Sequence, residues 1–495
     1  MEKIIPHHIN GETVVAPDRI LEINNPATGL PIAKIFCANQ DLVNQTVTSA
    51  ILAQKEWAKV PAIKKAKIFR QFALTIENQI DHLAQLVTQE HGKTLEDAKA
   101  SIQRGLEILY YHCDVQQQLQ GHYSHHVSQH IHTHTLHQPL GVCAGIAPFN
   151  FPVMVPMWMM MPAIACGNSF ILKPSEKVPS AALQLIEWLE ASGLPKGVVQ
   201  CIQGDSQTVQ HLLEHPDIAA FTAVGSTQAA RYIYTEATAR GKRAHTFGGA
   251  KNHAVVMPDA DFEHAAENIV NAAYGSAGQR CMAISAVITV GTETAQKLTE
   301  KLIEKIKKIK IGPGDAPNID MGPVISAKQK DFLLQCLEEG QKEGAKLLVD
   351  GRNFLIPEQG YFLGPSLFDE VNRSMTIYQN ELFGPILIIL RADDLGEAIN
   401  IINQNRYGNG SVIFTQSGLA AQTFSDEVTA GMVGINVPIP VPIVSHPFGG
   451  WKDSSFGDRP MHALESIHFY TKQKTITCTW PKKENQQGSF SMPHL

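Results

Sequence analysis

Between residues 140 and 250, short apolar runs alternate with amphipathic segments along the chain. The runs GVCAGIA, SFILK, GVVQC and IAAFTAV have the length of buried strands, and segment 180–193 carries its apolar residues at helical spacing. Strands that alternate with helices in this way are typical of a parallel sheet. A second alternating unit begins at about His253, with a helix expected over 262–274. The pattern therefore predicts an α/β protein with a doubly wound parallel sheet.

Other apolar patterns predict the helices that accompany these units. Apolar residues recur at helical spacing over 68–87, with Gly92 as a C-cap, and a second helix begins at about Leu95. The apolar stretch 151–164 contains three prolines and is too short to span a bilayer as a helix. We expect it to form a buried, methionine-rich helix.

Three further segments are expected to be extended or irregular. Residues 1–50 combine short apolar runs with turn signals, which predicts short strands and turns. Residues 436–445 (NVPIPVPIVS) hold three prolines, which exclude a central strand and favour a loop that forms one wall of a pocket. Residues 467–480 alternate between apolar and polar side chains, so they predict an edge strand that pairs inside or outside the chain.

A histidine-rich segment occupies residues 121–137. His130, His132 and His134 alternate with other residues, so an extended strand would place three imidazoles on one face. Zinc or another metal is conceivable there, but no carboxylate or thiol supplies a second cluster of ligands. We expect no metal site and interpret the segment as a polar strand in a hairpin arm.

Composition narrows the class of protein. The 495 residues allow two or three domains, and the formal net charge of −6 gives no electrostatic reason to expect a nucleic acid or membrane partner. Eight cysteines are scattered without a CxxC pair, which indicates a reducing compartment. The first residues show neither an export signal nor an organelle signal, so we expect a cytoplasmic protein.

Candidate chemistry centres on Cys281 within GSAGQRCMA. A cationic neighbour, Arg280, and glycines that let backbone N–H groups approach would both favour a thiolate, so Cys281 is the leading nucleophile. The alternative is a small buried hydrophobic residue without chemistry. No GxGxxG follows any strand, but Gly225-Ser226-Thr227 leads from a strand into a helix, where it would either bind a pyrophosphate or cap the helix.

Several motifs occur together and in order: PFNFP (148–152), FILKPSE (170–176), Gly225-Ser226, GQRC (278–281), ELFGP (381–385) and PFGGWKDSSFGD (447–458). Over residues 9–480 the chain resembles the aldehyde dehydrogenase superfamily. FGGAKNHAVVMPDAD (247–261) and GSAGQRCMAIS resemble its CoA-acylating methylmalonate-semialdehyde dehydrogenases. Where hydrolytic members carry the Glu of an ELGGK motif, this chain has Phe247, so the general base that would activate water is missing.

The resemblance implies a role for each matching residue. Cys281 would attack the aldehyde, and Asn150 would hydrogen-bond the developing alkoxide. Arg104 and Arg280 would bind the carboxylate of a small-molecule semialdehyde, although Arg104 by composition alone is a solvated charge. The implied NAD contacts are Ala147, Phe149, Lys173, Glu176, Lys177, Ser226, Gly248 and Glu381. Glu176 near the ribose 2′-hydroxyl would repel a phosphate, which favours NAD over NADP.

The implied reaction is NAD-dependent oxidation through a thioacyl enzyme, with coenzyme A as acceptor and loss of CO2, giving propionyl-CoA or acetyl-CoA. A hydrolytic enzyme that uses another base, such as Glu381, is the main alternative, and a non-catalytic homologue is the other. The choice between malonate and methylmalonate semialdehyde stays open, as do the CoA site and the pathway, which could be valine, inositol or β-alanine breakdown.

The implied fold is the α/β aldehyde dehydrogenase fold in three parts. An NAD-binding domain would span 1–120 and 140–250, and a second α/β catalytic domain would span 251–445. A β-arm for oligomerisation would comprise 121–139 and 467–495. The family implies a homodimer or homotetramer.

Overall fold

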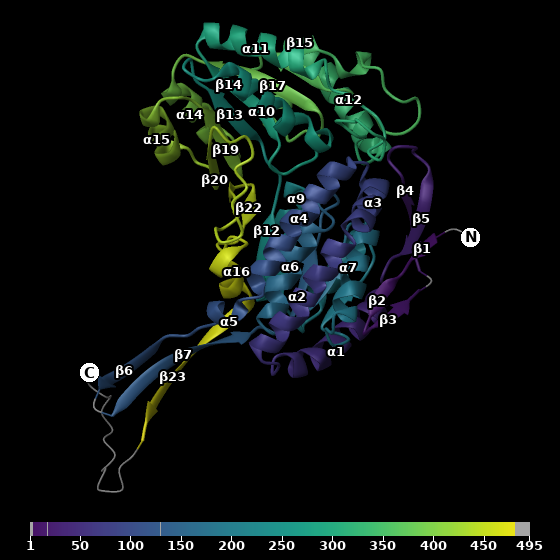
Figure 1. The fold of residues 1–495 in the computed structure, drawn as a ribbon, viewed down its shortest axis with the longest axis vertical. Coiled ribbons are helices and arrows are strands. Elements are labelled where there is room, and N and C mark those ends of the chain that lie inside the picture. Colours follow the sequence, from purple (N-terminus) through teal and green to yellow (C-terminus); the bar gives the residue numbers. More distant parts are fainter. Residues whose placement is uncertain (1–2, 17, 129, 481–495) are drawn as a thin grey trace.

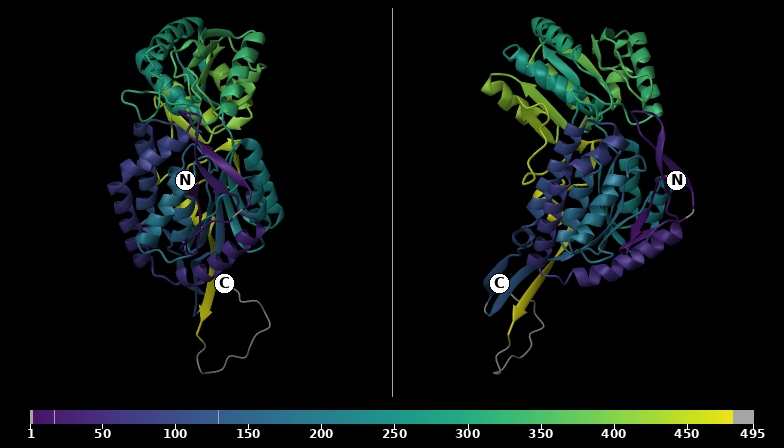
Figure 2. Two further views of the ribbon diagram at one scale, coloured as in Figure 1. Left: turned by 90° about the vertical axis from the view of Figure 1, so that its right-hand side faces the viewer. Right: turned by 45° about the vertical axis from the view of Figure 1, so that its right-hand side comes forward.

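The computed structural model describes residues 3–16, 18–128 and 130–480 as two α/β units and a projecting arm (Figure 1). The arm extends away from both units, as the two further views in Figure 2 make plain. Among the described residues, no helix is both long and apolar enough to cross a membrane.

The first unit surrounds an eight-stranded sheet, whose order in space is β22-β12-β11-β8-β9-β10-β2-β3. Its five central strands are parallel, and the three at the edges run antiparallel to their neighbours. The bounds are β22 Ser455–Phe456, β12 Arg243–Phe247, β11 Ile218–Val224, β8 Val142–Ile146, β9 Ser169–Lys173, β10 Val199–Cys201, β2 His7–Ile9 and β3 Glu12–Val14. The predicted doubly wound parallel sheet is confirmed.

Helices cover this sheet on both faces. They are α1 Gln40–Trp57, α2 Ala62–Asn78, α3 Ile80–His91, α4 Leu95–His112, α5 Val115–Gln118, α6 Met154–Ala165, α7 Ser180–Ala191, α8 Ser206–Glu214 and α9 Thr227–Ala239. The prediction of only strands and turns over 1–50 is wrong at its end, because α1 begins at Gln40. The Asn39 side chain caps α1 by accepting the Leu42 N–H at 3.0 Å.

Two of the predicted helical features are confirmed in detail. Gly92 ends α3 in the left-handed conformation at φ 89°, where a side chain would be strained. Helix α6 is buried along nearly its whole length, including four of its five methionines, because it lies between the sheet and the α2–α4 layer. Trp57 from α1 reaches it and donates its indole N–H to the Ile164 carbonyl at 2.8 Å.

The second unit surrounds a seven-stranded sheet in the order β15-β16-β17-β14-β13-β19-β20, parallel except for β15. The strands are β15 Lys346–Val349, β16 Ser366–Asp369, β17 Ile386–Ala392, β14 Ile284–Val290, β13 Asn252–Val256, β19 Gly410–Phe414 and β20 Met432–Ile435. Its helices are α10 Phe262–Tyr274, α11 Thr292–Ile306, α12 Ala327–Lys342, α13 Thr376–Gln379, α14 Leu395–Gln404 and α15 Gly418–Glu427.

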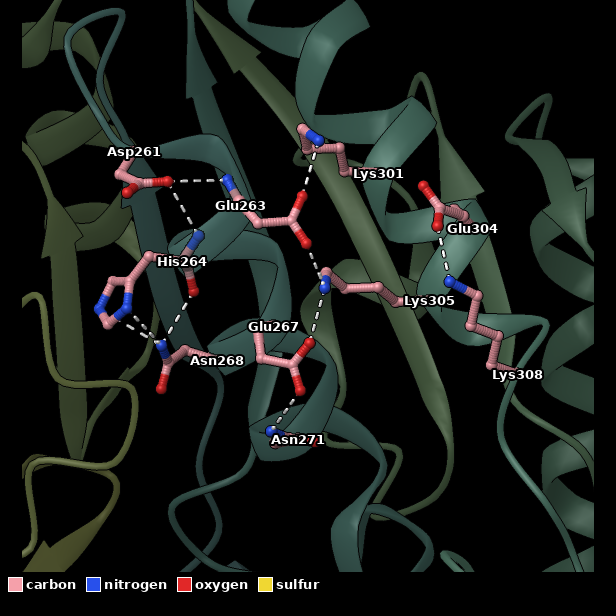
Figure 3. A network of polar contacts seen from close by, with 10 residues as sticks. All are labelled: Asp261, Glu263, His264, Glu267, Asn268, Asn271, Lys301, Glu304, Lys305 and Lys308. Atoms are coloured by element: carbon pink, nitrogen blue, oxygen red, sulfur yellow. Dashed lines mark hydrogen bonds and ion pairs between the residues drawn. The ribbon is translucent and has the colours of Figure 1, made fainter.

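Helix α10 leads directly into the Cys281 loop and is paired with α11 by a row of ion pairs (Figure 3). Lys305 contacts both Glu263 and Glu267 at 2.6 Å, and Lys301 contacts Glu263 at 2.7 Å. Exposed pairs of this kind contribute only about 0–1 kcal/mol each. The buried face of α11, with Leu298 and Leu302, therefore dominates the attachment of α11.

The arm is a three-stranded antiparallel sheet in the order β23-β7-β6. It comprises β6 Tyr123–Ser128, β7 Ile131–Pro139 and β23 Thr471–Thr479. The expected strand over 467–480 is wrong in its first four residues, because α16 Ala463–Tyr470 continues through Tyr470 before β23 begins. Residues 481–495, assigned to the arm from the sequence, lie outside the described residues.

Three short pairings complete the fold. Strands β1 Lys3–Ile5, β4 Ile20–Asn24 and β5 Pro31–Phe36 form a separate sheet, and β18 Tyr407–Gly408 pairs with β21 Trp451–Lys452. The chain passes from one main sheet to the other between Phe247 and Asn252. It returns at β22, so the two units are linked more than once.

Candidate active site

The loop that carries Cys281 is bent sharply at the end of α10. A 3₁₀ turn over Gly275–Gly278 follows, in which Ser276 and Ala277 have φ values of 55° and 52°. Such values are unfavourable for residues with a side chain and cluster at functional sites. A Cβ on Gly278 would lie 2.2 Å from the Gly384 carbonyl oxygen, so glycine there permits contact with the 381–385 motif.

Cys281 opens into a pocket of about 370 Å³. The pocket is lined by Asp97, Ala100, Ser101, Arg104, Phe151, Met154, Arg280, Cys281, Met282, Ile439, Val441 and Phe448. The predicted wall from the proline-rich loop is present through Ile439 and Val441. The structure thus brings the candidate nucleophile and both candidate arginines, Arg104 and Arg280, into one cavity.

Both arginines are held by partners on α4 or on the proline-rich loop. Arg104 donates to the Pro442 carbonyl at 2.9 Å and pairs with Glu107 at 2.6 Å. Arg280 donates to Asp97 Oδ1 at 2.9 Å. The Arg104 side chain is partly exposed rather than fully solvated, and it lines the pocket while it contacts Glu107 and Pro442.

A buried cation lies behind this pair. The Lys93 Nζ is 3.6 Å from Asp97 Oδ2 and lies 4.4 Å from the centre of the Phe151 ring. Burial alone would raise the pKa of Asp97, but the charges of Lys93 and Arg280 outweigh it and lower the pKa to about 2. The Asp97 carboxylate therefore remains charged and pairs with two cations, Lys93 and Arg280.

Asn150 lies beside the Cys281 loop. Its buried side chain donates from Nδ2 to the Gln279 carbonyl at 3.1 Å, two residues before Cys281. Gln279 is itself buried and accepts the Ile325 N–H at 3.0 Å through Oε1. The amide of Asn150 is thus fixed relative to the thiol by polar contacts.

Most of the candidate cofactor residues follow the carboxyl ends of parallel strands in the first sheet. Strand order reverses between β8 and β11, since β9 and β10 extend one side of β8 while β11 and β12 extend the other. In open α/β sheets, ligands bind at this switch point, outside the carboxyl ends. Ala147 and Phe149 follow β8, Lys173, Glu176 and Lys177 end or follow β9, Ser226 follows β11, and Gly248 follows β12.

Charged residues after β9 form a compact group. The Lys173 Nζ is 3.2 Å from Glu176 Oε2. Burial would raise the pKa of Glu176, but the adjacent Lys173 charge lowers it below its ordinary value. Lys177 lies 5.5 Å from the centre of the Phe149 ring, and burial lowers the pKa of this lysine. The group offers one carboxylate and two amines at the sheet edge.

The remaining three candidates meet where the two units adjoin. Ser226 caps α9 by accepting the Ala229 N–H at 3.3 Å, so the predicted helix cap is present at the candidate pyrophosphate site. Thr227 Oγ1 accepts the N–H of Gly249, next to Gly248, at 3.0 Å. Glu381 accepts the Ala250 N–H at 2.8 Å, and burial raises its pKa to about 7.

A family model for the aldehyde dehydrogenases matches residues 14–476. The chain belongs to the aldehyde dehydrogenase family. Malonate-semialdehyde dehydrogenase of Pseudomonas aeruginosa is 46% identical over 492 residues, 99% of each chain. A Dictyostelium discoideum protein bearing the name of an acylating methylmalonate-semialdehyde/malonate-semialdehyde dehydrogenase is 40% identical, covering 98% of this chain and 93% of its own.

Solved structures agree with this assignment to the aldehyde dehydrogenases. A methylmalonate-semialdehyde dehydrogenase from Oceanimonas doudoroffii superposes with a TM-score of 0.96 at 42% identity, covering 97% of this chain and 99% of its own. A Sinorhizobium meliloti protein solved in complex with NAD superposes with a TM-score of 0.97 at 44% identity, covering 98% and 99%.

The groups expected to favour a thiolate at Cys281 of this aldehyde dehydrogenase are opposed by burial. Burial raises the pKa of the Cys281 thiol to about 12, and the nearby Glu381 carboxylate adds to the rise. The N–H groups of Cys281 and Met282 and the charge of Arg280 lower it, but less. Sequence proximity to Arg280 was a poor guide because that guanidinium is already paired with Asp97.

Phe247 lies in an aromatic cluster where hydrolytic aldehyde dehydrogenases were expected to carry their base. Its ring stacks on His245 at 4.5 Å and approaches Phe448 at 5.7 Å and Trp158 at 6.1 Å, measured between ring centres. Phe448 also lines the Cys281 pocket. An apolar side chain thus occupies the position of the hydrolytic base, and the rings around it form an aromatic environment suited to phenylalanine.

Sequence reasoning missed several polar residues of this aldehyde dehydrogenase. Asp97 escaped notice, although Lys93 four residues earlier and the helix start at Thr94 marked an interacting pair. Asn252 and Asn409 both bind the loop of Cys281 through contacts that no local pattern reveals. The histidine-rich arm proved to be a hairpin, and the described part of the chain holds no group of three potential ligands placed to bind a metal.

Proposed function

We propose that the protein catalyses the NAD-dependent, CoA-acylating oxidation and decarboxylation of malonate semialdehyde and methylmalonate semialdehyde. The products would be acetyl-CoA and propionyl-CoA, respectively. One observation carries the proposal: Cys281, Arg104 and Arg280 line one pocket. The pocket thus combines a nucleophile with two cations suited to a carboxylate. The names of the relatives that match the chain over nearly its full length support the same reaction.

The reaction begins when the Cys281 sulfur attacks the aldehyde carbon of the bound semialdehyde. The thiol would release its proton to solvent, and a carbon–sulfur bond would form while the carbonyl π-electron pair moves to oxygen to give an alkoxide. Asn150 Nδ2 and the Cys281 N–H would donate to this oxygen. Support comes from the bond between Asn150 and the Gln279 carbonyl, which holds the amide beside the thiol loop.

The first sheet offers residues suited to NAD at its switch point. Lys173 and Glu176 would bind the adenosine ribose, Ser226 and Gly248 the pyrophosphate region, and Glu381 the nicotinamide ribose. Ala147, Phe149 and Lys177 would complete this surface. The fit is supported by the ion pair of Lys173 with Glu176 and by the amino end of α9 at Ser226. When bound at these residues, NAD would supply the acceptor for the hydride that leaves the former aldehyde carbon.

The acyl group then resides on Cys281 as a thioester. Phe247 supplies no carboxylate to activate water, so water is a poor acceptor. A CoA thiol is the better nucleophile: its sulfur attacks the thioester carbon, Cys281 leaves as the thiolate, and acyl-CoA forms. Before this transfer, the two arginines would hold the carboxylate of the thioester on Cys281 until it leaves as CO2, and the resulting enolate would take up a proton from solvent.

The decisive experiment measures NADH formation from each semialdehyde with NAD, with and without CoA, and identifies the acyl product. Turnover that requires CoA and yields acetyl-CoA or propionyl-CoA with CO2 supports the proposal. Equal turnover without CoA, giving a free acid, would establish the hydrolytic alternative and overturn the inference from Phe247. A comparison of the two substrates at equal concentration decides which is preferred.

We infer further that the arm mediates assembly into a homodimer or homotetramer. Both outer strands of the arm, β6 and β23, are edges of its sheet, and such edges pair readily with another chain. We place the enzyme in the cytoplasm, which is supported by free cysteines at all eight positions. Light scattering of the purified enzyme tests the first statement, and cell fractionation tests the second.

A further inference from the structure

Two asparagine side chains, one from a strand of the second sheet and one from the residue just before another strand, converge on the backbone of Cys281. Asn252 Nδ2 donates to the Cys281 carbonyl at 2.9 Å, and Asn409 Nδ2 donates to the same oxygen at 3.0 Å. Both side chains are buried, at 4% and 6% exposure. One carbonyl oxygen has two lone pairs, so this pair of amides saturates it.

Each asparagine is itself fixed by further contacts. Asn252 is the first residue of β13, and it also donates to the Ala283 carbonyl at 2.9 Å and accepts the Gly410 N–H at 3.1 Å. Asn409 lies between β18 and β19, and it contacts the Met282 sulfur at 2.9 Å. The Cys281 loop is thereby tied to two strands of the second sheet.

The accepting carbonyl belongs to the same planar peptide unit as the Met282 N–H. A peptide whose oxygen accepts two hydrogen bonds is polarised, and its N–H becomes a stronger donor. Burial raises the pKa of the Cys281 thiol, whereas the N–H of Met282 and the N–H of Cys281 itself lower it. The amides therefore act on the thiol through one peptide unit.

We propose that Asn252 and Asn409 are positioning residues for the nucleophile: they orient and polarise the Cys281–Met282 peptide so that its N–H stabilises negative charge on the Cys281 sulfur. The inference rests on the proposed role of Cys281 as nucleophile.

The charged groups around the thiol explain why neutral amides matter here. Glu381 disfavours a thiolate, whereas Arg280 favours one but is paired with Asp97. Lys93 also interacts with the thiol charge and is likewise engaged by Asp97. Burial opposes the thiolate most strongly and raises the pKa of Cys281. Fixed dipoles stabilise the sulfur without introducing another buried charge.

The test is the pH dependence of iodoacetamide alkylation at Cys281, followed by mass spectrometry of the peptide that contains it. Asn409→Leu keeps the approximate size of the side chain and removes the donor. We expect the midpoint to rise by about one pH unit, with alkylation at neutral pH slowed about tenfold. The kcat for the semialdehyde should fall by a similar factor, with KM changed by less than about twofold.

Asn409→Asp provides a second variant of the same shape that cannot donate when ionised, and it should show a shift at least as large. Asn403→Leu is the matched control, because Asn403 also bridges backbone segments, at 2.9 Å to the Glu427 carbonyl, but on the exposed side of the second unit. It should leave the alkylation midpoint unchanged even if it lowers the melting temperature.

An unchanged midpoint in folded Asn409→Leu or Asn409→Asp enzyme would overturn the inference. Failure of the proposed function looks different. If Cys281→Ser still produces NADH, Cys281 is not the nucleophile. Another outcome is that the wild-type enzyme leaves both semialdehydes unreacted while the asparagine variants still shift the midpoint of alkylation. In that case Asn252 and Asn409 are positioning residues for Cys281, and the proposed substrate is wrong.

Discussion

The guanidinium of Arg280 donates to Asp97 Oδ1 over 2.9 Å at the wall of the Cys281 pocket. This bond uses part of the guanidinium and leaves other N–H groups to face a ligand, since arginine has five donors in a planar fork. Asp97 is balanced at the same time by the buried Lys93. The pocket wall thus keeps a positive charge, and the orientation of the Arg280 guanidinium is fixed before any substrate binds.

Replacing this arginine tests the carboxylate site. Arg280→Ala should lower kcat/KM for malonate semialdehyde about 10- to 100-fold, because a hydrogen-bonded charge pair with substrate is lost. The loss with propanal, which has no carboxylate, should be much smaller. Steady-state kinetics with both aldehydes provide the measurement.

Arg352→Ala is a suitable control, since Arg352 forms a comparable ion pair with Asp350 outside the pocket lining. Equal losses with propanal and malonate semialdehyde in Arg280→Ala would show that the arginine supports the site in general rather than the substrate carboxylate.

Replacing Phe247 tests why water is a poor acyl acceptor: either no carboxylate is present to activate it, or the bulk of the Phe247 ring keeps it out. Phe247→Ala should reduce the free energy of unfolding by about 3–5 kcal/mol, because a buried ring is lost from the aromatic cluster. The requirement for CoA should persist, since alanine adds no base. Urea unfolding and NADH formation with and without CoA measure both effects. A folded variant that turns over without CoA would mean that the bulk of Phe247, and not a missing carboxylate, keeps water out.

Glu176 should control the choice of dinucleotide. Lys173 lowers the pKa of Glu176 against the effect of burial, so its carboxylate is charged at neutral pH and repels a 2′-phosphate. Glu176→Gln should reduce the ratio of kcat/KM with NAD to that with NADP by about tenfold. Glu187→Gln, on the exposed side of α7, should leave the ratio alone. No change in the ratio for Glu176→Gln would remove Glu176 from the cofactor site.

Glu90 gives the enzyme a stability that depends on pH. This buried residue at the end of α3 accepts the Ser180 N–H at 3.1 Å, at the start of α7. Burial raises its pKa from 4.5 to about 7, although the Ser180 donors oppose the rise. The folded state therefore binds the proton more tightly than the unfolded chain between these values. Its contribution to stability is complete below pH 4.5 and is lost as pH rises through about 7.

Glu90→Gln removes this titration. The stability of wild type relative to the variant should fall as pH rises from 4.5 to about 7, and then become constant. Urea denaturation at several pH values gives the comparison, with Glu187→Gln as the exposed control. A difference that rises with pH would mean that Glu90 is charged in the folded enzyme.

The strands and helices of the two sheets could be predicted because their apolar patterns are local. Helix α10 has the expected bounds, since Asp261 caps its start and apolar residues follow at helical spacing. Helix α1 was missed although its sequence indicates it. The Asn39 cap is followed by residues that lie buried at helical spacing: Leu42, Val43, Thr46, Val47 and Ala50. The failure at 467–470 was not avoidable, because β-forming side chains there are held in a helix by packing that the sequence does not display.

The candidate site shows the same division. Cys281 and Arg280 lie in a quoted motif, and Arg104 was located by resemblance alone. Other contacts join residues more than 25 positions apart in the sequence and depend on how the units pack. They are the contact of Asp97 with Arg280 and those of Asn252 and Asn409 with Cys281. The rise in the pKa of Cys281 could not be predicted either, since burial is its largest cause and burial is a property of the fold.

The late strand β22 also constrains how the chain becomes folded during synthesis. Phe247 at the end of β12 has its antiparallel neighbour at Ser455, so the edge of the first sheet stays unpaired until nearly the whole chain has left the ribosome. The chain of the intervening unit must be synthesised before that edge closes. Pairings so distant in sequence fold slowly and leave an open strand that other nascent chains can join. We therefore expect the ribosome-bound intermediate, rather than the finished enzyme, to be the form that depends on chaperones.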